Sequence, residues 1–159
     1  MQKNIIPYWL IPEVIQHSKH ILKTYASITG AVLYDDTYSD QYRSYLLYHA
    51  PYVVVSHGMQ QDPIFNYANL TAQQLWKLDW NQFTALPSRL SAEADLSKNR
   101  QRLLEEAAQK GYFDNYSGVR ISSKGMRFLI ENVLLWNLKN ETNEKIGQAA
   151  LFRNWTNLY

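Results

Sequence analysis

The chain has 159 residues, of which 46% are apolar and 19% charged, a composition typical of one globular domain. Its 16 basic and 14 acidic residues leave a net charge of +2, and the scattered basic residues argue against nucleic-acid binding. Because cysteine is absent, the sequence excludes disulfides, thiol chemistry and cysteine-ligated metal sites.

The N-terminal segment MQKNIIPYWLIPEV is interrupted by two prolines and lacks the apolar run of a signal peptide. No apolar run approaches the roughly 20 residues that a membrane span needs. We therefore expect a cytoplasmic protein without a membrane partner.

Two amphipathic helices are expected first. Residues 12–30 carry apolar side chains at three- and four-residue intervals, with proline in the first turn and glycine at the end. A second helical pattern covers residues 38–49 and is closed by a proline. Residues 1–50 are predicted to form a helical extension of the domain in residues 51–159.

A hairpin and short helices are expected next. The β-branched run 52–56 predicts a strand, 58–63 has turn composition, and 64–67 predicts the partner strand. Asn69 or Thr71 is expected to cap the following helix, and Asp79 with Gln82 gives a capping box for another short helix. A longer helix is predicted from Ser97 to Lys110.

The last third of the chain predicts three more strands, at 112–122, 126–138 and 146–155. Two early strands must then pair with three late ones across the helices. The predicted fold class is α+β, with a five-stranded antiparallel sheet that carries helices on one face, preceded by the N-terminal helical extension.

This order of elements resembles the Per-Arnt-Sim (PAS) sensor domains, and IFNYANLTAQQLWKLDWNQF is similar to their second strand and first helices. The segments YSGVRISSKGMRFLIENVLLWNL and QAALFRNW, with SHG and LPSRLSAEADLSKNR, resemble the MEKHLA domain over nearly the whole chain. That domain stands alone in cyanobacteria and other microbes and ends the plant class III homeodomain leucine-zipper proteins. The six-letter string that names it is absent here, and the resemblance implies a regulatory module without transferring a ligand or a catalytic residue.

Strand alternation supplies the first candidate ligand-binding residues. The even-numbered residues of 126–136 and 146–152 are predicted to face an inner surface, where Asn132 and Gln148 are the polar residues. These amides either orient a ligand or pair within the core. Trp136 and Phe152 are expected to form an apolar wall beside them.

The opposite face of the sheet is expected to be apolar and to need a cover. Its residues are Leu129, Val133, Leu135, Leu151 and Trp155. We expect the helix in residues 12–28 to cover them, within the chain or exchanged across a homodimer.

Four further candidates each have a structural alternative. Tyr116, which shares a strand face with Arg120, and Trp76 line either a pocket or the core. His57 either reaches the pocket or caps a turn. Arg89 either anchors a carboxylate or phosphate or pairs with Glu93.

The sequence thus predicts a PAS-like sensory or regulatory module that binds a small organic ligand between sheet and helices and signals through a protein partner. The alternative is an interaction or homodimerisation module with a filled core and no ligand. A small enzyme on a cone-shaped α+β fold is disfavoured because no catalytic signature is present.

The sequence also limits the cofactors that the domain can bind. The cysteinyl adduct of light-oxygen-voltage domains is excluded, whereas a non-covalent flavin stays open. Haem is disfavoured because residues 97–110 contain no histidine. His17 and His20 have no third ligand nearby, so no metal site is expected.

Overall fold

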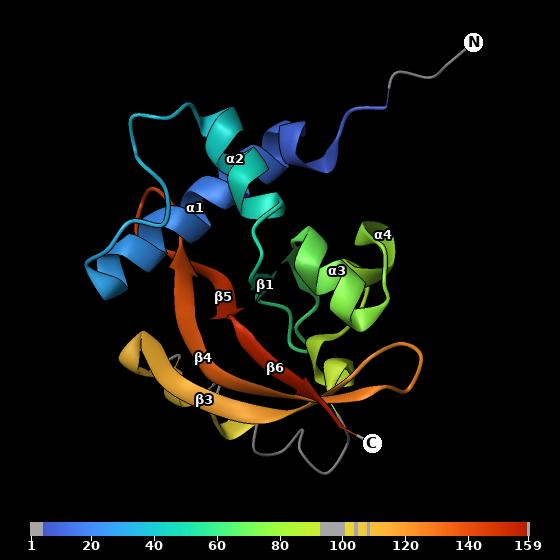
Figure 1. The fold of residues 1–159 in the computed structure, drawn as a ribbon. Coiled ribbons are helices and arrows are strands. Elements are labelled where there is room, and N and C mark those ends of the chain that lie inside the picture. The colour runs from blue at the N-terminus through green and yellow to red at the C-terminus, as the bar shows by residue number, and fades with distance from the viewer. Residues whose placement is uncertain (1–4, 93–100, 104, 108, 159) are drawn as a thin grey trace.

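The computed structural model describes residues 5–92, 101–103, 105–107 and 109–158. The sheet lies between two layers of helices (Figure 1). The elements are η1 (Tyr8–Leu10), α1 (Pro12–Thr29), α2 (Asp40–Tyr48), β1 (Val53–His57), β2 (Phe65–Ala68), α3 (Leu70–Trp76), α4 (Trp80–Phe83), η2 (Ser88–Ser91), β3 (Tyr112–Ile121), β4 (Arg127–Lys139), β5 (Lys145–Phe152) and β6 (Asn154–Asn157). Residues 101–103, 105–107 and 109–110 are also helical. The predicted start of that helix at Ser97 lies outside the described residues.

The strands form one antiparallel sheet in the order β2-β1-β5-β4-β3. The last predicted strand divides at Arg153, so that a short β6 pairs with β4 beyond the end of β5 and the sheet has six strands. Strand β1 pairs with β5, which brings distant parts of the chain together at the centre. The α+β class, the antiparallel sheet and the N-terminal helix are confirmed.

The inner core lies between the sheet and α3 with α4. Trp76 of α3 contacts Phe83, Phe128 and Phe152 edge to face, with ring centroids 5.0–6.1 Å apart. Edge-to-face packing suits the aromatic quadrupole and adds to the burial of large apolar surfaces. These rings fix the distance between α3 and the sheet, and so the space left for a cavity.

The outer core lies between the other face of the sheet and the helices α1 and α2. Ile21 of α1 and Leu47 of α2 are fully buried there. Trp136 of β4 donates from Nε1 to Thr24 Oγ1 at 2.8 Å. The first helix therefore covers the outer face within its own chain.

Two bulges in the β3–β4 pair reverse the predicted faces of β4. Asn115 and Asn132 have φ of 58° and 54°, and the register shifts on either side of Tyr116. Asparagine tolerates this left-handed conformation, and each bulge inserts one unpaired residue. Beyond Asn132 the odd-numbered residues therefore face inward.

The structure corrects several predicted orientations on β4, β5 and β6. Leu134 and Trp136, expected inside, pack in the outer cluster, as does Ile146. Three residues that were expected outside join the inner cluster instead, namely Val133, Leu135 and Trp155. Leu151 lies on the outer face as predicted.

The helix caps follow the sequence closely. Asn69 Oδ1 accepts from Ala72 N at the start of α3, so Asn69 rather than Thr71 is the cap. Asp79 and Gln82 form the predicted capping box of α4. No helix among the described residues is both long and apolar enough to cross a bilayer.

Candidate functional site

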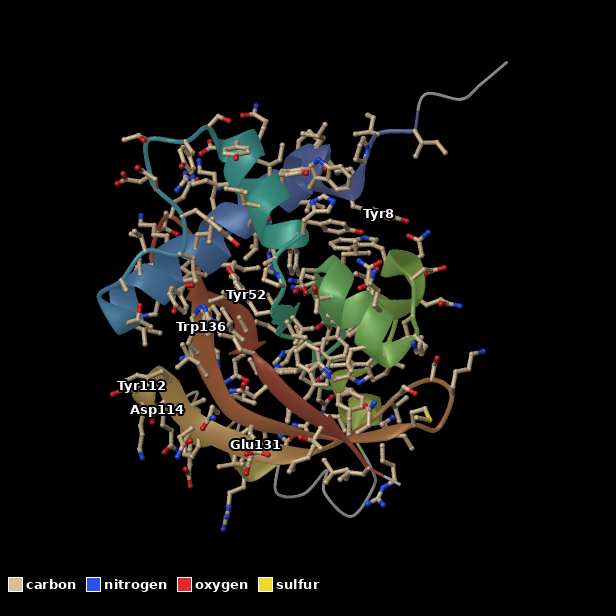
Figure 2. All side chains as sticks on the ribbon, in the orientation of Figure 1. Tyr8, Tyr52, Tyr112, Asp114, Glu131 and Trp136 are labelled. Atoms are coloured by element: carbon tan, nitrogen blue, oxygen red, sulfur yellow. The ribbon has the colours of Figure 1, made fainter. Side chains whose placement is uncertain are left out.

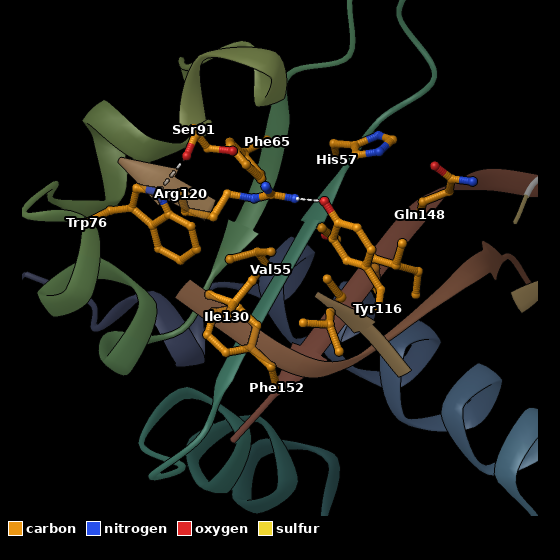
Figure 3. Close-up of a pocket in the computed structure, with 15 residues that line it drawn as sticks. Val55, His57, Phe65, Trp76, Ser91, Tyr116, Arg120, Ile130, Gln148 and Phe152 are labelled. Atoms are coloured by element: carbon orange, nitrogen blue, oxygen red, sulfur yellow. Dashed lines mark hydrogen bonds between the residues drawn. The ribbon is translucent and has the colours of Figure 1, made fainter. Parts of the chain in front are cut away.

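A cavity of about 40 Å³ lies between the sheet, α3 and η2 (Figure 3). Its wall is mainly apolar and comes from every layer of the inner core. Val55, Phe65, Ile130, Val133, Leu135 and Phe152 contribute most of that apolar lining. Its polar residues are Ser56, His57, Ser91, Tyr116, Arg120 and Gln148. An apolar hollow with a few convergent polar groups is the usual form of a small-molecule site.

The strongest polar group of the cavity is Arg120 on β3, of which only 5% is exposed. Its Nη2 donates to Tyr116 Oη at 2.8 Å (Figure 3). Its Nη1 donates to Val119 O at 3.0 Å. The guanidinium carbon lies 5.4 Å from the centroid of the Tyr116 ring. Among the described residues, the acceptors that hold this buried cation are both neutral.

Gly118 makes the Tyr116–Arg120 contact sterically feasible. All three residues lie on the inner side of β3, spaced by two along the strand. A Cβ at Gly118 would come within 2.6 Å of Tyr116 Oη and 3.1 Å of Arg120 Nη1. The tyrosine hydroxyl therefore occupies the space that a side chain at Gly118 would take.

His57 and Gln148 form the wall between the cavity and a surface pocket of about 220 Å³. They are cross-strand partners on β1 and β5. His57 Nδ1 lies 2.9 Å from Gly58 O, and because a carbonyl only accepts, this nitrogen carries the proton. Gln148 Nε2 donates to Asn137 Oδ1 at 3.3 Å. Movement of these two side chains would join the cavity to the outer pocket.

The structure brings most of the predicted site residues to this cavity. His57, Trp76, Tyr116, Gln148 and Phe152 line it. Asn132, Trp136 and Arg89 do not.

The structure shows why each of these three residues does not line the cavity. Asn132 is exposed because the β4 bulge turns it out of the ladder. Trp136 is fully buried on the opposite face toward α1 (Figure 2). Arg89 is on the surface, where Nε pairs with Asp62 Oδ2 at 3.1 Å. Glu93, its predicted partner, lies outside the described residues.

Strand periodicity placed Arg120 on the same strand face as Tyr116 and left open whether it lines a pocket or the core. The sequence signal for its role is the run Tyr116, Gly118, Arg120, in which a glycine lies between a tyrosine and an arginine on one strand face. Alternation alone gives no sign that a charged side chain on a strand is buried.

A second polar cluster ties α1 to the sheet. His17 Nε2 lies 2.8 Å from Ser56 Oγ, and Ser56 in turn donates to Asn66 Oδ1. Ser56 is 1% exposed, lies beneath α1 and also lines the inner cavity. The cluster is an interface between helix and sheet.

We expect the stability of the fold to fall in acid because of His17. Burial, with a smaller contribution from His20, lowers the pKa of His17 from 6.5 to about 4. The unfolded chain takes up a proton below pH 6.5, whereas the folded chain stays neutral until about pH 4. The stabilisation present above pH 6.5 is thus lost as the pH falls, by about 3 kcal/mol of unfolding free energy.

Urea unfolding at several pH values measures this effect, with His17→Gln as the comparison. Glutamine keeps an N–H donor for Ser56 and does not titrate. Subtracting its pH profile removes the common contribution of the carboxylates. Parallel profiles for the two proteins between pH 7 and pH 4 would contradict the assignment.

A flavin does not fit the described cavity. A cofactor of that size needs several hundred Å³, whereas about 40 Å³ is open. The side chains of Trp76, Tyr116 and Arg120 fill the remaining space between sheet and helix.

The sequence matches the family model of the MEKHLA domain over residues 15–157. No curated protein is similar to the chain in sequence. The fold is similar to a PAS domain from Colwellia psychrerythraea, with a TM-score of 0.62 and 12% identity, covering 74% of this chain and 95% of that one. At these identities the likeness to solved structures shows the fold alone.

Two further solved structures carry the same likeness. An RNA-binding light-oxygen-voltage receptor gives a TM-score of 0.63 at 12% identity, with 80% of this chain and 35% of that one covered. A PAS domain in complex with ethanol, from a LuxR-family transcriptional regulator of Burkholderia thailandensis, gives 0.54 at 12% identity, covering 72% and 95%. The inner cavity of this chain thus lies within a PAS-type fold.

Proposed function

Because this chain belongs to the MEKHLA domain family, we propose that it is a sensory or regulatory module that binds a small molecule in its inner cavity. The bound state is passed on through a protein interaction. The observation that carries the proposal is the cavity with Arg120, Tyr116 and Gln148 on an apolar wall. Burial of the ligand supplies affinity, and these polar groups orient it.

A route from the cavity to the surface runs through α3. Trp76 lines the cavity, and its backbone oxygen accepts from Ser123 N in the β3–β4 turn at 2.9 Å. Ser123 Oγ also donates to Lys77 O at 2.7 Å. A ligand that shifts Trp76 therefore moves both the end of α3 and an exposed turn, where a partner can detect the change.

Filling the cavity is expected to abolish ligand binding. Ala150 lines the cavity from β5, and Ala150→Val adds two carbon atoms to its wall. A thermal-shift screen of wild type should identify a small molecule that raises Tm by roughly 5 to 10 °C at 100 times Kd. The Ala150→Val protein should fold and lose this shift.

Ala85→Val is the matched control, because Ala85 is exposed and does not line the cavity. It should keep the full shift. An equal shift in Ala150→Val would place the ligand elsewhere. A screen in which no small molecule raises Tm would contradict the proposal.

A second candidate function is an interaction or homodimerisation module without a ligand. The observation in its favour is a row of exposed tyrosines, Tyr38, Tyr42 and Tyr45, with ring centroids 5.1 and 6.2 Å apart. Exposed aromatic side chains are enriched in protein interfaces. Sedimentation of the ligand-free protein distinguishes a homodimer from a monomer.

A further inference from the structure

Arg120 carries a buried positive charge in the inner core. A buried guanidinium is costly unless an anion lies beside it. Among the residues that the structure describes, the ion pairs are Lys19–Asp40, Arg43–Asp40 and Arg89–Asp62, and none involves Arg120. The acceptors of its hydrogen bonds are a hydroxyl and a backbone carbonyl. Within the part of the chain that the structure describes, the cavity thus contains a cation without its counter-charge.

We propose that the ligand of the cavity is a small organic carboxylate bound by Arg120, an inference that rests on the proposed function. A guanidinium presents parallel N–H groups that match the two oxygens of a carboxylate. Tyr116 Oη accepts from Arg120, so its own hydrogen is left to donate to the ligand. Arg120 supplies the charge, and Tyr116 supplies a second donor from the same side.

The size and lining of the cavity narrow the ligand further. One water-sized group needs about 10 to 15 Å³, so the 40 Å³ cavity has room for about three. The walls beyond Arg120 are the apolar side chains of Ile130, Val133 and Phe152. A second charge would be buried against them without a partner. A monocarboxylate with a short alkyl chain fits, and a dicarboxylate does not.

A ligand with a longer alkyl chain can extend past the wall formed by His57 and Gln148. These side chains border both the cavity and the surface pocket that Lys145 and Glu105 also line. The carboxylate would enter from that pocket and stop at Arg120. A chain that exceeds the cavity would extend back between His57 and Gln148.

The test compares sodium propionate with propionamide, a neutral molecule of almost the same shape, at constant ionic strength. Calorimetry or ligand-observed NMR on the wild-type chain should show that propionate binds at least about tenfold more tightly than propionamide. Acetate and butyrate should also bind, and succinate should not. This comparison needs no variant, so it holds whatever a substitution does to folding.

Two variants assign the effect to Arg120. Arg120→Met keeps a long side chain without the charge and should weaken propionate binding by about ten- to a hundredfold while leaving propionamide unchanged. Arg127→Met, which removes an exposed arginine from the neighbouring strand, should have no effect. Gly118→Ala, which pushes Tyr116 away from Arg120, should weaken propionate binding severalfold. Its effect on folding should be milder than that of Arg120→Met.

The outcomes separate this inference from the proposed function. If propionamide or another neutral molecule binds in a cavity that Ala150→Val closes, while carboxylates do not bind, the sensory module stands and the carboxylate inference is wrong. Equal affinity for propionate in wild type and Arg120→Met would also overturn it. If neither carboxylates nor neutral molecules bind, both proposals fail.

Discussion

Asn69→Ala is expected to lower the free energy of unfolding by about 4 kcal/mol, because one side chain serves four backbone groups. Asn69 is fully buried at the junction of β2 and α3. Its Oδ1 accepts from Val54 N at 3.1 Å and from Ala72 N at 3.2 Å. Its Nδ2 donates to Tyr52 O at 2.8 Å and to Leu47 O at 3.2 Å.

Alanine leaves these four groups buried and without that partner. An unsatisfied buried amide or carbonyl typically costs about 1 to 3 kcal/mol, and part of the total is recovered by local relaxation. Urea denaturation followed by tryptophan fluorescence measures the loss. The change removes the tie between the end of α2, strand β1 and the start of α3.

Ser39→Ala is the matched control for the capping contribution alone. Ser39 caps α2 on the surface, where its Oγ accepts only from Tyr42 N, at 3.1 Å. Its replacement should cost about 1 kcal/mol. Equal losses for Ser39→Ala and Asn69→Ala would mean that the buried hydrogen bonds of Asn69 contribute nothing beyond a helix cap.

Trp136→Ala is expected to destabilise the protein by about 3 to 5 kcal/mol and to loosen α1 from the sheet. The indole is fully buried, donates to Thr24, and packs edge to face against Tyr25 at 5.7 Å. Its removal deletes the largest side chain of the outer core and leaves a cavity under the helix. Since whole domains are stable by only about 5 to 15 kcal/mol, this is a large fraction.

Denaturation and limited proteolysis together check this expectation. The Trp136→Ala protein should be cut faster near residues 30–39, which connect α1 to α2. Thr24→Val, which removes only the hydrogen bond, should cost about 1 kcal/mol and leave the proteolysis pattern unchanged. A loss below about 1 kcal/mol in Trp136→Ala would show that residues 1–50 do not unfold as one unit with residues 51–159.

Because α1 covers the outer face of the sheet, that face is not open to the protein partner of the proposed function. Such a partner would bind other elements or the exposed side of the N-terminal helices. Both of these candidate surfaces contact a core, since Trp76 of α3 lines the cavity and Tyr48 of α2 packs in the outer cluster with Trp80. Under the proposed function, a ligand signal that passes through α3 would have a short path to the surface.

Local patterns in the sequence determined most of the elements. The spacing of apolar residues gave α1 and α2, and the capping residues Asn69, Asp79 and Gln82 gave the short helices. These features depend on contacts within three or four residues, which the sequence states directly. The order of strands and helices then limited the fold to one antiparallel sheet.

Only the tertiary structure decided which side chains reach the cavity. Unbroken alternation placed Asn132 and Trp136 inside, but the bulges at Asn115 and Asn132 shift β4 by one residue and turn every later side chain over. Whether an asparagine bulges depends on the strand opposite it, which lies elsewhere in the chain. Arg120 became a site residue for the same reason, because its burial comes from Trp76, Tyr116 and the strands around them, and no local pattern records those contacts.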